Sequence, residues 1–136
     1  MRVPHFCFVY SAASATVGMS AGIWMGIAED FTVAPAHAHL NLLGWVTMML
    51  YGLYHRAAGA ADGLVRTQVA LNAAGVPLMA GGLAAYLASG NTALVPFVIA
   101  GSLLCFASMI LFGVVVLRGA TRADGAATGS WLPVGS

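Results

Sequence analysis

The sequence predicts an all-α membrane protein with four transmembrane helices, and three observations lead to this prediction. The chain has 136 residues, of which 60% are hydrophobic and only 7% charged. In a soluble domain, about a quarter of the residues are charged. It contains four charge-poor stretches, each long enough to cross a bilayer, which takes about 20 residues of helix. All of its arginines fall in segments that a four-helix topology places on one side of the membrane.

The first two helices are expected over residues 6–28 and 36–54. Each is a run without Asp, Glu, Lys or Arg, and charge returns after them at Glu29 and at Arg56. A cleaved secretory signal peptide, with its cleavage site near Ala36, is the alternative for the first run. Its apolar stretch is longer than the roughly 7–15 residues of such peptides, which favours a transmembrane helix.

The third and fourth helices are expected within residues 67–117, which contain no charged residue at all. That length suits two helices, 67–88 and 93–117, and the Ser-Gly-Asn-Thr run between them is a turn signal. The four helices form a single domain, residues 1–118. The remaining residues, 119–136, are rich in Gly, Ala and Thr, and we expect them to form a short flexible cytoplasmic tail.

The arginines orient the predicted helices. They precede the first helix, flank the loop between the second and third, and follow the fourth: Arg2, Arg56, Arg66, Arg118 and Arg122. The positive-inside rule makes this side cytoplasmic, so both termini are expected in the cytoplasm. The expected location is a bacterial-type inner (plasma) membrane, crossed several times. A net charge of +1 argues against a nucleic-acid partner and leaves membrane lipid as the first partner.

Most of the chemistry in this sequence lies in two histidines, His37 and His39, at the outer end of the second helix. An imidazole in or near hydrocarbon is costly to desolvate, and metal ligation is its commonest special task. Residues two apart on an α-helix differ by about 200° in direction, so this pair cannot chelate one ion as an i,i+4 pair does. The geometry favours a large cofactor between helices, with haem as the leading case. Copper or zinc held between neighbouring chains is the alternative.

Nearby residues are compatible with a flat cofactor. His37, Asn41 and Gly44 share one helical face, and the missing side chain at Gly44 would leave room for a macrocycle. Close helix packing is the competing interpretation of this glycine. We take as candidate cofactor-binding residues His37, His39, Asn41 and Gly44, and both histidines as candidate metal ligands. His5 and His55, at the cytoplasmic interface, are expected to have no ligand role.

At this helix the sequence resembles a known family. The run His-Leu-Asn-Leu-Leu that begins at His39 resembles the His-x-Asn-Leu-Leu run in the second helix of nitric oxide reductase catalytic subunits. These subunits belong to the haem–copper oxidase superfamily, and their histidine there is an axial ligand of the low-spin haem b. The His-Ala-His of residues 37–39 also resembles a His-x-His pair that ligates two different haems in a later helix. The resemblance covers roughly residues 11–56 and implies a haem b protein related to subunit I.

The departures from that family concern assembly. Superfamily subunits have about twelve helices, built as three arcs of four, so this chain would match one arc. It offers no second axial ligand for a haem on His39, because His55 lies roughly 24 Å away along the helix. We therefore expect a homo-oligomer. A trimer, in which His37 of one copy and His39 of the next share a haem, is favoured, and a dimer with two His39 ligands is the simpler competitor.

A bis-histidine iron has no vacant position, which favours redox chemistry by electron transfer over gas reduction. No carboxylate lies within the predicted spans to relay protons, which argues against autonomous oxygen or nitric oxide reductase activity. The competing hypothesis is a non-haem protein, either a copper- or zinc-binding module or a structural membrane subunit of a larger complex.

Overall fold

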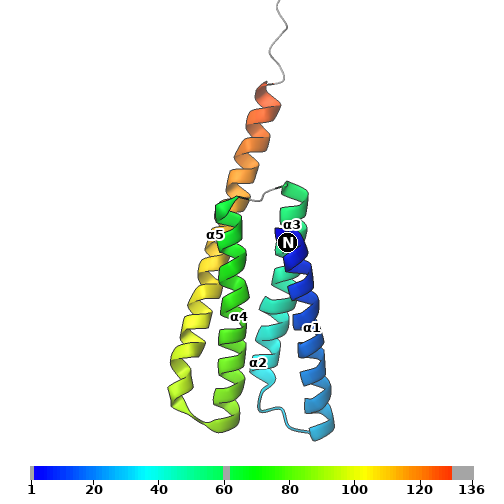
Figure 1. Ribbon diagram of the computed structural model, residues 1–136, viewed down its shortest axis with the longest axis vertical. Coiled ribbons are helices and arrows are strands. Elements are labelled where there is room, and N and C mark those ends of the chain that lie inside the picture. The colour runs from blue at the N-terminus through cyan, green and yellow to red at the C-terminus, as the bar shows by residue number, and fades with distance from the viewer. Residues whose placement is uncertain (1, 60–61, 130–136) are drawn as a thin grey trace, which may run out of the picture.

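The computed structural model describes residues 2–59 and 62–129, with side chains as far as residue 120. Every regular element in this part of the chain is helical, and four helices run alternately up and down (Figure 1). The second of them is divided into three pieces. In chain order the elements are α1 (Val3–Ala28), α2 (Ala34–His39), η1 (Leu40–Thr47), α3 (Met48–Ala58), α4 (Gly63–Ser89), the short 3₁₀ turn η2 (Thr92–Leu94) and α5 (Val95–Gly129).

Three helices are long and apolar enough to cross a membrane: Val3–Ala28, Gly63–Ser89 and Thr92–Ala120. These helices indicate a multi-pass membrane protein. The second helix differs from the expectation of one regular helix over 36–54, because its pieces of 6, 8 and 11 residues are wound differently. Its middle piece, η1, is a π-helix, in which hydrogen bonds run from i to i+5 instead of i to i+4.

The helix ends follow local chemistry. Pro4 and Pro35 lie in the first turns of α1 and α2, where a missing N–H costs nothing. The expected turn after the third helix is present, and Gly90 adopts the left-handed conformation there, with φ of 68°. α5 continues to Gly129, past the expected end at residue 117. Residues 130–136 of the expected tail lie outside the described residues.

The helices pack as two pairs. α4 and α5 run side by side, and the divided second helix lies along α1 (Figure 1). The backbones of α4 and α5 approach closely at two glycines, since a Cβ on Gly75 would lie 2.8 Å from the carbonyl oxygen of Gly101. Such close approach through small residues is how helices associate in lipid. Contacts of α4 with α2 and η1 join the two pairs.

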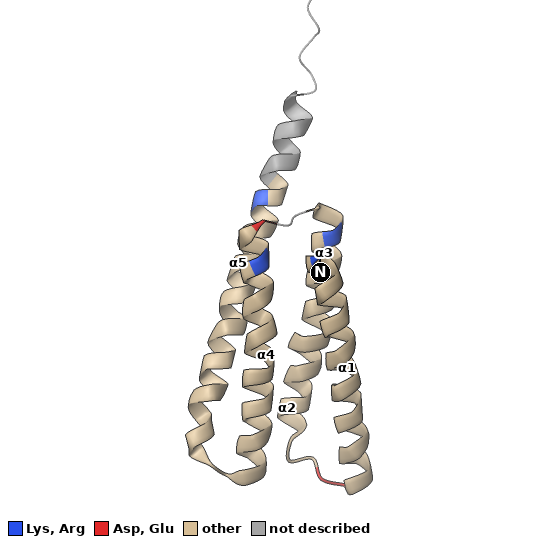
Figure 2. Ribbon diagram, viewed as in Figure 1, with Lys and Arg blue, Asp and Glu red and all other residues tan. Residues whose placement is uncertain are grey.

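The charged residues gather at the two ends of the molecule (Figure 2). We call one the arginine end, because it carries the described arginines, Arg2, Arg56, Arg66 and Arg118, together with Asp62. The opposite end carries Glu29 and Asp30 and lies close to α2 with its two histidines, and we call it the His39 end. The apolar core, formed by Cys7, Met48, Tyr51 and Val69, lies in the half nearer the arginine end.

Candidate functional site

His39 stands exposed at the end of α2, with one nitrogen tied to its own helix. Its Nδ1 lies 2.7 Å from the carbonyl oxygen of Pro35. A carbonyl oxygen only accepts, so Nδ1 carries the proton and donates it. In the neutral form of the ring, this tautomer leaves the lone pair on Nε2, and neutral imidazole is the form that binds a metal. A hydrogen bond from the other ring nitrogen to a carbonyl is also the usual support of a histidine ligand.

His37 has different surroundings, although it is only two residues away. Its ring is half-buried against α1, where a Cβ on Gly22 would lie 3.0 Å from His37 Cε1. The amide nitrogen of Asn41 lies 3.3 Å from each ring nitrogen and donates to the His37 carbonyl oxygen at 3.0 Å. His37 is therefore packed within its own chain, on a different side of α2 from His39.

Asn41 and Gly44 both serve contacts between helices. A Cβ on Gly18 would overlap the side chain of Asn41, so this glycine of α1 provides the notch that Asn41 fills. The Gly-x-x-x-Gly spacing of Gly18 and Gly22 thus receives Asn41 and His37 in turn. Space beside Gly44 is also occupied, because a Cβ there would lie 2.8 Å from Ser14 Oγ and 3.1 Å from Val76. This arrangement favours the helix-packing interpretation of Gly44.

The π-helix η1 follows directly after His39, and side chains bind three of its carbonyl oxygens. Thr47 Oγ1 donates to Leu42 O at 2.8 Å within the segment. Ser11 Oγ of α1 donates to Trp45 O at 2.9 Å, and Asn72 Nδ2 of α4 donates to Leu43 O at 3.1 Å. π-Helical segments are rare and often lie at functional sites. Sequence reasoning missed Ser11 and Asn72, although a lone Asn in a charge-free span is a signal in itself.

His55, which was expected near the cytoplasmic interface, is buried between the helices near the arginine end, with an exposed fraction of 1%. Its Nε2 lies 2.9 Å from Gln68 Oε1, and Gln68 Nε2 donates to Ser108 Oγ at 3.1 Å. Ser108 Oγ in turn donates to the Gln68 carbonyl oxygen at 2.7 Å. This chain of bonds joins α3, α4 and α5 near the arginine end. His5, by contrast, is exposed on α1.

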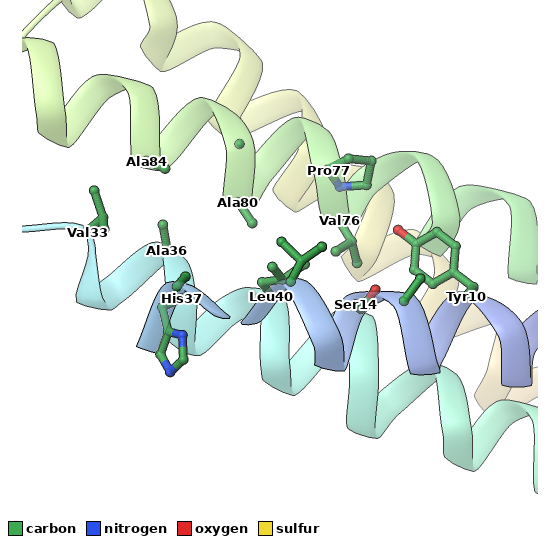
Figure 3. Close-up of a pocket in the computed structure, with 14 residues that line it drawn as sticks. Tyr10, Ser14, Val33, Ala36, His37, Leu40, Val76, Pro77, Ala80 and Ala84 are labelled. Carbon is green, nitrogen blue, oxygen red and sulfur yellow. The ribbon is translucent and has the colours of Figure 1, made fainter. Parts of the chain in front are cut away.

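A groove of about 500 Å³ lies between α1, α2 and α4. Small and apolar side chains line most of it, as Figure 3 shows for Val33, Ala36, Ala80 and Ala84. Pro77 in its wall cannot donate to Ala73 O four residues earlier, and Tyr10 OH donates to that oxygen instead, at 3.0 Å. The ring of His37 points away from the α4 wall in this view.

No group of three or more His, Cys, Asp or Glu side chains that could hold a metal ion occurs among the described residues. Cys7 and Cys105 are buried free thiols. Of the two histidines of α2, His39 is the one whose ring is exposed. Comparison with protein-family models, with curated proteins and with solved structures finds no match for this chain.

Proposed function

We propose that this chain is a membrane protein that binds haem b and carries electrons, with His39 Nε2 as an axial ligand of the iron. The observation that carries the proposal is the hydrogen bond from His39 Nδ1 to Pro35 O. That bond fixes the tautomer with a bare Nε2, and the ring is exposed, so a cofactor or a second chain has access to it.

The surroundings of His39 suit a hydrophobic macrocycle. Exposed apolar side chains follow it along the second helix, including Leu42, Trp45 and Val46. These side chains could pack against the apolar face of a flat group by dispersion contacts. A low-polarity setting also tunes the potential of a bound iron. Haem b held by two histidines would supply a reversible one-electron couple with no vacant iron position.

We assign the second ligand to another copy, because among the described residues one exposed imidazole lies at the His39 end. His37 is half-buried against Gly22 and Asn41, which argues against the trimer hypothesis, because His37 would be the second ligand there. The twofold arrangement, with His39 from each of two copies on one haem, needs no repacking of His37. It is the assembly that the geometry supports best.

Electron transfer is also the chemistry that the charges support. The described carboxylates, Glu29, Asp30 and Asp62, are all exposed at the ends of the molecule. A proton relay through the membrane needs ionisable groups within the spans, and autonomous oxygen or nitric oxide reduction would need such a relay. We place the arginine end on the cytoplasmic side of a bacterial-type inner membrane, which puts His39 at the outer surface.

A visible absorption spectrum of the detergent-purified protein tests the proposal. We expect a Soret band with sharp α-bands on reduction, and one haem for every two chains. His39→Ala should abolish these bands, while His5→Ala, which removes an exposed histidine from α1, should leave them unchanged. Colourless wild-type protein would contradict the haem proposal and leave the copper, zinc or structural alternatives, which metal analysis of the same sample separates.

A further inference from the structure

The hydrogen bonds that reach η1 come from neighbours on both of its sides. Ser11 belongs to α1 and Asn72 to α4, and their exposed fractions are 0% and 1%. A buried polar side chain without a partner is costly, so each of these donors favours a backbone path that brings a carbonyl oxygen to it. With regular α-helical winding, the carbonyl oxygens of Leu43 and Trp45 would point in other directions. The two donors therefore favour the π form of η1.

The winding of η1 decides how α2 is turned relative to α3. α3 is anchored in the core by Met48, Tyr51 and His55, which are almost wholly buried. α2 carries His39 at the other end of η1. A π-helix turns through a smaller angle per residue than an α-helix, so a difference in rotation about the helix axis accumulates over the eight residues of η1. A difference equal to the turn of one α-helical residue rotates the direction of His39 by about 100°.

We propose that Ser11 and Asn72 are positioning residues for His39. By holding η1 in its π form, they set the direction in which the imidazole leaves the helix and presents Nε2. They act through the backbone of η1 and not by contact with the ligand. The inference depends on the proposed function only for the identity of what His39 binds, since the direction of the ring is a property of the chain itself.

The test compares two double variants of the full chain in detergent. Ser11→Ala with Asn72→Leu removes both bonds to η1. The control, Tyr10→Phe with Gln68→Leu, removes one hydroxyl and one amide from the same two helices, one residue and one turn away. Its bonds, to Ala73 O, to Ser108 and to His55 of α3, do not reach η1. The control therefore reports what a general loss of stability does to His39.

The first readout needs no haem. Modification of His39 by diethyl pyrocarbonate is followed by mass spectrometry, together with amide hydrogen exchange over residues 40–47. Loss of one buried hydrogen bond shifts the balance between two backbone paths by about fivefold. We expect amide exchange in η1 to become faster by about that factor and the His39 rate to change in the first variant, with little change of either in the control. Equal His39 rates in the two variants would overturn the inference, and the single variants Ser11→Ala and Asn72→Leu serve if the double variant fails to fold.

The second readout uses the haem-loaded protein and separates this inference from the proposed function. Wild-type protein without haem would contradict the proposed function, yet the modification rates would still decide the positioning role. With haem present, the Ser11 and Asn72 variants should keep the pigment and change the anisotropy of its electron paramagnetic resonance spectrum. That anisotropy depends on the angle between the two axial imidazole planes. An unchanged spectrum together with unchanged rates would leave Ser11 and Asn72 as packing residues only.

Discussion

Two histidines at opposite ends of the second helix show how one residue type is given two roles. His39 and His55 each give one ring proton to an oxygen, on Pro35 and on Gln68 respectively. At His39 the remaining nitrogen is Nε2, on an exposed ring. At His55 it is Nδ1, the one buried side-chain nitrogen or oxygen without a hydrogen-bond partner among the described residues. A free imidazole lone pair can therefore bind a metal ion or a cofactor only where that group can reach it.

Aromatic rings close the region around His55. Tyr51, Tyr54 and Phe112 have ring centroids 6.4, 5.7 and 6.0 Å from that of the imidazole. A macrocycle could reach His55 only by displacing these rings. The enclosed His55 is therefore suited to stabilising the arginine end, and the ligand role that we propose falls to His39.

The largest expected effect is a difference in haem content between variants of His55 and His39. His55→Phe should retain the full haem content of the wild-type protein, because its ring contacts are replaced and His39 is untouched. His39→Ala should retain none. Pigment measured per chain after purification gives the answer, and loss of haem in His55→Phe at unchanged helical content would break the comparison.

A smaller effect is expected from the notch that holds Asn41 at the His39 end. Gly18→Ala forces the Asn41 side chain out of its place, and overpacking of this kind costs about 1–3 kcal/mol of unfolding free energy. Gly26→Ala on the same helix is the matched control, since a Cβ there meets nothing within 4 Å. Unfolding by denaturant in micelles should separate the two variants. Equal stabilities would show that the notch is not needed.

Breaking the hydrogen bonds that link His55, Gln68 and Ser108 at the arginine end should cost a comparable or smaller free energy of unfolding. Ser108→Ala leaves the amide of Gln68 without its acceptor, at a cost of about 1–2 kcal/mol. Ser102→Ala, also on α5, removes only a bond within its own helix, to Val98 O, and should change stability by less than about 0.5 kcal/mol. The same unfolding measurement applies. A Ser108 variant as stable as the Ser102 variant would remove the structural role that we assign to this chain.

The smallest effect concerns the loop beside the His39 end. Thr32 donates hydrogen bonds from its side chain and its backbone, and they hold the pKa of the Asp30 carboxyl below its ordinary value. The charged form is favoured in the folded state, so this contribution is present at neutral pH and is lost as the pH falls through the lowered pKa. Thr32→Val should raise the pKa of Asp30 towards its ordinary value in an NMR titration. The effect on stability should be slight, because Asp30 is fully exposed, and an unchanged pKa would show that the side chain of Thr32 plays no part.

The sequence predicted much of the helical organisation because that information is local. Long charge-free runs predicted α1, α4 and the apolar part of α5, and the turn before Asn91 lies where the Ser-Gly-Asn-Thr run indicated. The gathering of arginines at one end also followed from the order of the helices. The difference in direction between His37 and His39 came from helical geometry alone. Gly44 could not be assigned in this way, because its role depends on Ser14 and Val76 from two other helices.

Composition, charge and helical periodicity act over short distances, and they were enough to predict a chain of apolar helices with two histidines at one end. The π-helical winding of η1, the packing of His37 beside an exposed His39, and the enclosure of His55 emerged only when the helices packed. Each of these outcomes depends on partners from other parts of the chain. Ser11 and Asn72 reach carbonyls 34 and 29 residues from themselves, and Gln68 lies 13 residues from His55. No local pattern specifies which buried donors will meet which acceptors once the helices pack.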